Sequence, residues 1–175
     1  VEELGEIKSD LLYEYRQGYV GPAINHYGNM LRVGDCAYDA LANRIGTVDL
    51  RLMGYPVAVH ADMLLWGKQE TPEMCARQLL NILFAVPQIS VLLTNATEEQ
   101  RRVIQNYLAY WQANRDLLLH APLTVTGMDG NYSTVSACDG KKRVTALYLD
   151  PTTAFDGMPL DVFNGTVKDV LYLEN

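Results

Sequence analysis

Charged residues close two short apolar segments of the chain, and their spacing is the first sign of a functional site. Arg32 and Asp35 end one apolar run, and His60 and Asp62 end a second run further along the sequence. Short runs of this kind are typical of buried strands. An α/β barrel builds its active site from acidic and basic groups at the carboxyl ends of such strands. The pattern therefore predicts a site where these two segments end.

Asp35 is the leading candidate for a general acid/base. A group that protonates a leaving oxygen must be a carboxyl with a raised pKa, held at a strand end within reach of the substrate. The structural alternative is a helix N-cap for the segment that begins near Ala37, because Asp is a favoured capping residue. Arg32 is either an ion-pair partner of Asp35 or a clamp for a substrate hydroxyl, and the spacing leaves both interpretations open.

Glu14 and Arg16 lie two residues apart in a tyrosine-rich segment, so a strand there places both side chains on the same side. A charged pair on a buried strand is costly unless it is paired or functional. The alternative is an exposed ion pair on an edge strand. His60 and Asp62 share a side in the same way, but two residues do not complete a metal site, so no metal or cofactor is expected.

Other polar and aromatic residues nearby have more ordinary interpretations. Trp66 is either a core residue or a platform for the apolar face of a sugar. Charges of mixed sign at helical spacing between positions 39 and 51 favour a solvated or ion-paired surface, made of Asp39, Asn43, Arg44, Asp49 and Arg51.

Composition excludes several classes of partner. The chain has 175 residues, 49% of them hydrophobic, with a formal net charge of -7 and a pI of about 4.9. An acidic protein is repelled by nucleic acid and by anionic membrane surfaces, so neither is expected as a partner. No apolar run reaches the roughly 18 residues that cross a bilayer. The three cysteines, Cys36, Cys75 and Cys138, are too widely spaced for a disulfide framework or a zinc site.

The chain changes character near residue 121, which predicts two domains, 1–121 and 122–175. In the first, short strands alternate with helices about four times, which is typical of a parallel sheet with crossover helices. A capping box, Thr97 with Gln100, begins the longest helix. The expected strands are 12–15, 29–33, 57–60 and 88–93. Residues 39–52 are expected to form a helix or an irregular crossover, and further helices are expected at 72–84 and over a long stretch after 97.

In the second part, strands are expected at 124–126, 133–137, 143–149 and 168–173. Asp-Gly and Asn-Gly pairs stand between them, and these pairs favour tight turns because both residue types tolerate positive φ. Residues 122–175 are therefore expected to form a small antiparallel β domain.

The order of these motifs resembles that of the melibiase-type α-galactosidases and related retaining glycoside hydrolases. The resemblance extends from about Leu12 to Leu149. It rests on Glu14 and Arg16, then Arg32-x-x-Asp35, then Asp62-Met63, and then Val86-Pro87-Gln88 before a strand. Those enzymes join a TIM barrel to a C-terminal β domain. The resemblance implies an α/β fold in which residues 1–121 are the C-terminal half of a (β/α)8 TIM barrel, and residues 122–175 are an incomplete antiparallel β-sandwich-like domain.

The resemblance also implies roles for individual residues. Asp35 matches the general acid/base that follows the sixth barrel strand. The family's nucleophile is an Asp on the fourth strand, and its expected place lies before Val1. Contacts with the substrate are implied for Glu14, Arg16, Tyr19, Arg32, Asp62 and Met63.

The implied function is that of a C-terminal fragment of an α-glycosidase, most similar to an α-galactosidase, which hydrolyses terminal α-linked sugars by a retaining double displacement. The fragment alone is expected to be inactive. A half barrel leaves its sheet edges open, so the expected partners are a carbohydrate substrate and either the N-terminal half of the same parent chain or a second copy. The alternative is a non-catalytic carbohydrate-binding or self-associating structural module. No compartment is predicted.

Overall fold

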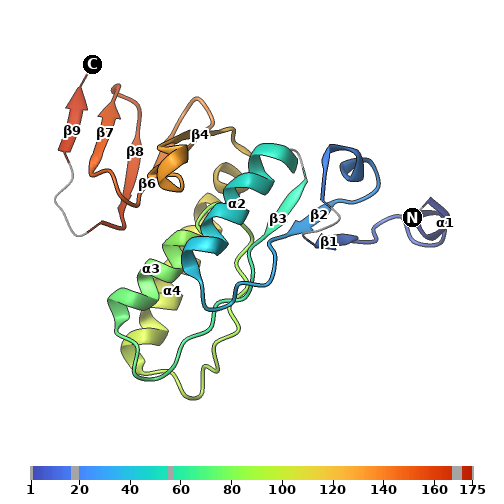
Figure 1. Cartoon of the computed structure of the whole chain (residues 1–175), viewed down its shortest axis with the longest axis horizontal. Coiled ribbons are helices and arrows are strands. Elements are labelled where there is room, and N and C mark those ends of the chain that lie inside the picture. The colour runs from blue at the N-terminus through green and yellow to red at the C-terminus, as the bar shows by residue number, and fades with distance from the viewer. Residues whose placement is uncertain (1, 17–19, 55–56, 167–170, 175) are drawn as a thin grey trace.

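The computed structural model describes residues 2–16, 20–54, 57–166 and 171–174, and shows a mixed α/β fold. Three helices, α2 (Ala40–Gly54), α3 (Pro72–Asn81) and α4 (Glu98–His120), lie between a small parallel sheet and the C-terminal strands (Figure 1). The short elements are α1 (Glu2–Ile7), η2 (Pro22–His26) and η3 (Met128–Gly130). Among the described residues, no helix combines the length and apolar character that crossing a membrane requires.

The N-terminal sheet contains β1 (Glu14–Arg16), β2 (Met30–Arg32) and β3 (Ala58–His60), in that order and all parallel. Two isolated parallel bridges, His60 to Val86 and Leu64 to Ile89, continue the same direction beyond β3. The parallel arrangement predicted from the sequence is confirmed. The strand predicted at 88–93 is wrong in extent, because only the bridge at Ile89 falls inside it.

The two faces of this sheet differ in polarity. Leu31 and Val59 share one register row and are almost completely buried in the hydrophobic core. The next row contains Arg16, Arg32 and His60, whose side chains point to the opposite face because successive residues of a strand alternate. One face of the sheet therefore packs into the core, and the other carries the charged groups.

The helix starts follow the capping signals of the sequence. Thr71 is the N-cap of α3, and its side chain accepts a hydrogen bond from Met74 N at 3.3 Å. At α4, Thr97 and Gln100 form the predicted capping box. Both helix N-termini thus begin where their side chains satisfy backbone N–H groups that have no partner within the helix.

Asn43, Arg44 and Arg51 of α2 are buried, so the solvated or ion-paired surface predicted for them is wrong. Asp39 and Asp49 are exposed, as predicted. The guanidinium of Arg51 donates hydrogen bonds to the carbonyl oxygens of Phe84, Leu118 and Ala121. Arg44 lies over the ring of Tyr148, 4.1 Å from its centroid, and burial lowers its pKa. Arg51 thus supplies hydrogen-bond donors to carbonyl groups at a chain turn and at the end of α4, whereas Arg44 also donates to the side chain of Asn81 at 3.2 Å.

The C-terminal strands form two sheets. One has the order β4 (Leu123–Thr126), β5 (Thr134–Cys138), β6 (Arg143–Leu147) and β8 (Leu160–Asn164); the other pairs β7 (Thr152–Phe155) with β9 (Leu171–Glu174). The pairs β4–β5 and β5–β6 are antiparallel as predicted, but β6–β8 and β7–β9 are parallel. A wholly antiparallel domain is therefore wrong. The chain leaves the first sheet for β7 and then returns to it, so β8 runs in the same direction as β6.

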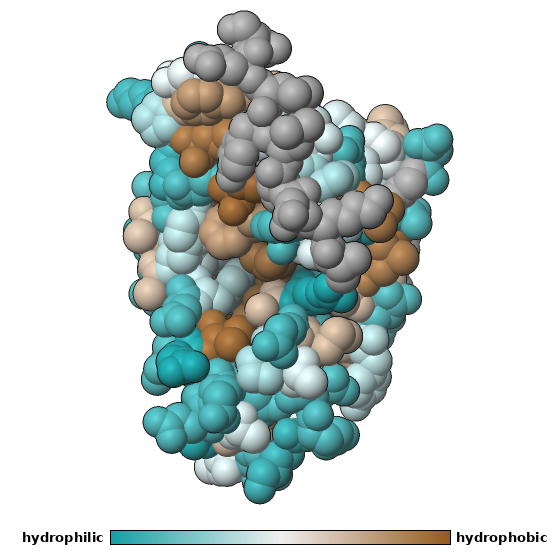
Figure 2. Space-filling model, turned by 90° about the vertical axis from the view of Figure 1, so that its left-hand side faces the viewer, coloured by the Kyte–Doolittle hydropathy of each residue, from teal (hydrophilic) through white to brown (hydrophobic). Residues whose placement is uncertain are grey.

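A single hydrophobic core extends through both predicted parts of the chain, from Leu31 to Val135 and Val144. Tyr148 anchors the C-terminal strands to α3 by donating a hydrogen bond to Leu80 O at 2.8 Å. On the face shown in Figure 2, apolar side chains lie in the middle and hydrophilic ones gather at the lower end. The division at residue 121 remains a prediction.

Candidate functional site

A connected network of charged groups lies at the carboxyl ends of β1, β2 and β3. Arg16, Arg32 and His60 are the last residues of these strands and occupy one register row. Asp35 and Asp62 follow β2 and β3 by two or three residues. Because parallel strands end at the same edge of the sheet, segments far apart in the sequence bring these groups together, as the spacing predicted.

The innermost contact of this network is a buried ion pair between Arg32 and Asp62. The side chain of Asp62 is only 1% exposed, and one of its oxygens accepts from the Arg32 guanidinium. Its other oxygen accepts from the backbone N–H of Cys36 at 2.5 Å. The attraction in a buried ion pair offsets the cost of desolvation best when the remaining polar atoms are also hydrogen-bonded, as both Asp62 oxygens are. In Arg32, however, the buried Nε has no hydrogen-bond partner within the part of the chain that the structure describes.

Asn43 of α2 holds the segment that carries Asp62. Its side-chain amide donates to Asp62 O and its carbonyl oxygen accepts from Asp62 N, both at 3.0 Å. This pair of bonds fixes the backbone beyond the end of β3 by tying it to the helix. The sequence prediction missed this role. The only signal in the sequence was the position of Asn43, an amide side chain in the first turn of the helix that follows the Arg32–Asp35 segment.

Asp35 lies at the outer side of the network. Its side chain is 71% exposed, forms an ion pair with Arg16, and has one oxygen 3.9 Å from the terminal nitrogen of Arg32. The spacing left Arg32 as either an ion-pair partner of Asp35 or a clamp for a substrate hydroxyl. In the structure Arg32 forms its closer ion pair with Asp62, and Asp35 forms its closer ion pair with Arg16. A carboxyl that acts as an acid at neutral pH requires a covered, low-dielectric setting, and in this chain Asp35 faces solvent.

Glu14 and His60 form the remaining contact, with His60 Nδ1 3.8 Å from Glu14 Oε2. Burial lowers the pKa of His60; the nearby Glu14 carboxylate opposes that shift and Arg32 adds to it. Glu14 and Arg16 lie on the same side of an edge strand, as predicted, but each pairs with a neighbouring strand or loop. The strand thus directs one acidic and one basic group toward the same edge.

Cys36 lies next to the network but is poorly suited to act as a nucleophile. Burial raises the pKa of its thiol to about 11, and the carboxylates of Asp62 and Asp39 add to this shift. The reactive form of cysteine is the thiolate, so Cys36 is protonated at neutral pH. All three cysteines are free.

The other predicted site residues contribute less to the network. Met63 is half-buried beside Asp62. Tyr19 lies outside the described residues. Asp62 was predicted to contact substrate, but in this chain both of its carboxylate oxygens bind protein groups. Among the described residues, no group of three or more His, Cys, Asp or Glu side chains is placed to hold a metal.

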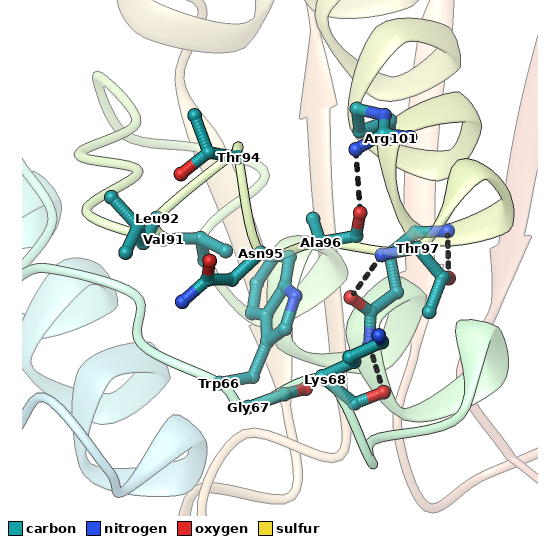
Figure 3. Close-up of a pocket in the computed structure, with 11 residues that line it drawn as sticks. Trp66, Gly67, Lys68, Val91, Leu92, Thr94, Asn95, Ala96, Thr97 and Arg101 are labelled. Atoms are coloured by element: carbon teal, nitrogen blue, oxygen red, sulfur yellow. Dashed lines mark hydrogen bonds between the residues drawn. The ribbon is translucent and has the colours of Figure 1, made fainter.

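A second feature, a hollow of about 560 Å³, lies where the chain continues past the bridge between Leu64 and Ile89 (Figure 3). One wall is formed by residues 66–68, and the other by residues 91–97 together with the first turn of α4. The segments that contain Leu64 and Ile89 run parallel to each other and continue the direction of β3. The hollow therefore lies toward the same edge of the sheet as the charged network.

Comparison of the chain with protein-family models, with curated proteins and with solved structures finds no match. The function must therefore be inferred from the residues and their geometry.

Proposed function

We propose that this chain supplies the acid/base side of an α-glycosidase active site, with Asp35 as the proton donor and acceptor. In this proposal, residues 1–121 are the C-terminal half of a (β/α)8 barrel, the nucleophile belongs to a strand outside these 175 residues, and the substrate is a terminal α-linked sugar, most similar to an α-galactoside. The partner that completes the site is the N-terminal half of the same barrel.

The observation that carries the proposal is the convergence of Glu14, Arg16, Arg32, Asp35 and Asp62 at one edge of a parallel sheet. Barrel enzymes place their catalytic groups at this edge, on the ends of several different strands. The strand order of the sheet, β1 to β3 in sequence, agrees with consecutive strands of a barrel. The resemblance of the motif order to melibiase-type enzymes supports the choice of reaction.

The proposed reaction has two steps. First, the external carboxylate attacks the anomeric carbon while Asp35 donates its proton to the leaving glycosidic oxygen, which breaks the C–O bond and leaves a glycosyl ester. Second, Asp35, now a carboxylate, takes a proton from a water molecule as that water attacks the anomeric carbon and expels the nucleophile. Two inversions at one carbon give net retention.

The other groups of the network position the acid/base. The buried Arg32–Asp62 pair and the Asn43 bonds hold the ends of β2 and β3 together. Arg16 holds the Asp35 carboxylate at the front of this network. In the proposed complete barrel, the other strands would cover the Asp35 carboxyl group and exclude solvent from it. They would thereby create the low-dielectric setting that a proton donor needs.

The exposure of Asp35 also favours a second candidate, a carbohydrate-binding module that hydrolyses nothing. An exposed carboxylate paired with Arg16 is suited to accepting hydrogen bonds from sugar hydroxyls. In that case the protein that contains this chain would bind α-galactosides without releasing galactose.

The experiment is hydrolysis of an aryl α-galactoside by the protein that contains this chain, as wild type and as Asp35→Asn. General acid/base catalysis contributes about 10²- to 10⁴-fold, so the substitution is expected to lower the rate by that amount. Asp116→Asn, at an exposed position of α4, is the matched control and should leave the rate unchanged. A rate near wild type in Asp35→Asn rejects the assignment, and sugar binding without any hydrolysis favours the second candidate.

A further inference from the structure

Helix α2 makes contacts that hold the charged network in place. In its first turn, Asn43 forms two hydrogen bonds with the backbone of Asp62, both at 3.0 Å. Gly46 lies one turn further along the same side of the helix, where an added Cβ would come within 2.6 Å of Val33 Cγ1. Val33 follows β2 directly, and Asp35 stands two residues beyond it. The segments that carry Asp35 and Asp62 are therefore both packed against this helix.

The C-terminal strands contact the same helix through the ring of Tyr148. This residue follows β6 and is almost completely buried. The guanidinium of Arg44 lies over its ring, 4.1 Å from the ring centroid, which is within the range of about 6 Å for a cation–π contact. The Tyr148 hydroxyl donates to Leu80 O at 2.8 Å and fixes the ring. Because Arg44 is the next residue after Asn43, this contact supports the turn of α2 that binds Asp62.

Tyr132, in the turn between β4 and β5, reaches α2 from a backbone conformation that bulky residues rarely adopt. Its φ is 61°, in the left-handed region. Its hydroxyl donates a hydrogen bond to the carboxylate of Asp49, in the second half of α2. A residue keeps such a conformation only where its surroundings over-determine it, and functional sites are rich in such cases. The strained turn therefore points to a role for this contact with the helix.

Arg51 makes a third link, near the end of α2. Its guanidinium donates to the carbonyl oxygens of Phe84, of Leu118 near the end of α4, and of Ala121, just before β4. The position at which the chain enters the C-terminal strands is thus tied to the helix. Three polar side chains of α2 therefore hold it against later parts of the chain.

The C-terminal strands reach α2 without touching the network by polar contacts. Within the described ranges, no hydrogen bond or ion pair joins residues 122–174 to the charged groups of the network. The further bonds of Asp62 go to Cys36 and Asn43, which both lie in the N-terminal part of the chain. The influence of these strands on the network must then pass through an element that contacts both, as α2 does (Figure 1).

We propose that the C-terminal strands set the position of the charged network through α2, with Tyr132 and Tyr148 as positioning residues. The two tyrosines orient the helix, and Asn43 passes that orientation to Asp62 and so to its partner Arg32. The strands from β4 onward then belong to the functional unit. This claim about geometry stands without the proposed glycosidase function, and only its effect on the rate of hydrolysis rests on that function.

The test follows the imidazole NMR signals of His60, which lies in the network 3.8 Å from Glu14. The protein that contains this chain carries isotope-labelled histidine, and His60→Gln assigns the signals. At alkaline pH, where the imidazole is neutral, Tyr132→Phe is expected to shift them. Tyr110→Phe is the matched control and should leave them in place. The Tyr110 hydroxyl also donates to a carboxylate, that of Asp161 at 2.6 Å, but it joins α4 to β8.

Two variants of Tyr148 separate its ring from its hydroxyl. Tyr148→Phe loses the bond to Leu80 O but keeps a ring beneath Arg44, so the His60 signals should stay close to their wild-type positions. Tyr148→Leu also removes the ring and is expected to shift the signals. An unchanged signal in Tyr148→Leu removes the positioning role of this tyrosine.

Asn43→Ala cuts the proposed link between the helix and the network. In this background, adding Tyr132→Phe is expected to cause little further shift of the His60 signals. Shifts that simply add, unchanged signals in Tyr132→Phe, or a shift of equal size in Tyr110→Phe would each overturn the inference.

The effect on catalysis is tested separately, with an aryl α-galactoside as substrate. Tyr132→Phe is expected to lower kcat about tenfold with little change in KM, because a misplacement of about 1 Å can cost roughly 10²-fold. A shifted His60 signal together with a normal rate in Asp35→Asn would remove only the enzyme proposal. Unchanged His60 signals together with an inactive Asp35→Asn would remove only the positioning role.

Discussion

At the scale of single residues, the central contact is that of Arg32, whose guanidinium binds the buried Asp62 carboxylate and lies 3.9 Å from a carboxylate oxygen of Asp35. Arg32, Asp35 and Asp62 were recognised from their positions after apolar runs, and they do meet. The pairing of Arg32 with Asp62 across 30 residues was not predictable, because spacing reports neighbours within one segment only. Asn43 was missed for the same reason: its partner is the backbone of Asp62, in the segment that follows β3.

The pKa of His60 provides a test of the described geometry. Burial lowers this pKa and Glu14, at 3.8 Å, opposes the shift by stabilising the imidazolium. Glu14→Gln removes that attraction, so the pKa of His60 should fall further below its ordinary value. A histidine NMR titration measures this, with Glu2→Gln in α1 as the control. An unchanged or higher pKa in Glu14→Gln would show that the two groups do not interact.

The same shift has a consequence for stability. Since the pKa of folded His60 lies below the unfolded value, the unfolded chain binds this proton more readily. His60 therefore lowers the free energy of unfolding as the pH falls below about 6.5, the unperturbed histidine value.

At the scale of elements, local sequence signals predicted where the helices begin. The bounds of the strands depend instead on pairing with distant parts of the chain. Both N-caps, Thr71 and Thr97, function as expected because capping is a contact within four residues. The strands β7 and β8 were not predicted, since their edges depend on partners elsewhere in the chain. Asp156-Gly157 and similar pairs predicted tight turns within one antiparallel domain, but this turn connects β7 in one sheet to β8 in the other.

Gly46 shows how closely α2 approaches the end of β2. A Cβ at position 46 would lie 2.6 Å from Val33 Cγ1, and Val33 has a short, stiff side chain. In Gly46→Ala, overpacking costs about 1–3 kcal/mol and helix propensity returns about 1 kcal/mol. The free energy of unfolding is therefore expected to fall by up to about 2 kcal/mol. Urea denaturation measures the difference.

Gly5→Ala in α1 is the matched control, because nothing lies within 4 Å of a Cβ at that position. Adding Val33→Ala to Gly46→Ala should recover part of the lost stability. If Gly46→Ala is as stable as wild type, the described close packing of α2 against Val33, just after β2, is wrong. The position of α2 that places Asn43 against Asp62 would then also be in doubt.

At the scale of the whole molecule, α/β character and a parallel N-terminal sheet were predictable from alternating apolar runs and helical periods. A mixed C-terminal sheet was not, because strand direction is set by chain crossovers that leave no local pattern. β1 lies at the edge of its sheet, with Glu14 and Arg16 on it. If the proposed complete barrel exists, the strand that pairs with this edge is expected also to cover Asp35.

The most direct measurement uses the protein that contains this chain, as wild type and as Asp35→Asn. It compares kcat/KM for two aryl α-galactosides that differ only in the acidity of the phenol released. If Asp35 donates the proton, a dinitrophenol needs little help to leave, whereas an unsubstituted phenol needs full protonation. Asp35→Asn should then lose far more activity on the phenyl substrate than on the dinitrophenyl one. Equal losses on both substrates, or none, would contradict a proton-donating role for Asp35.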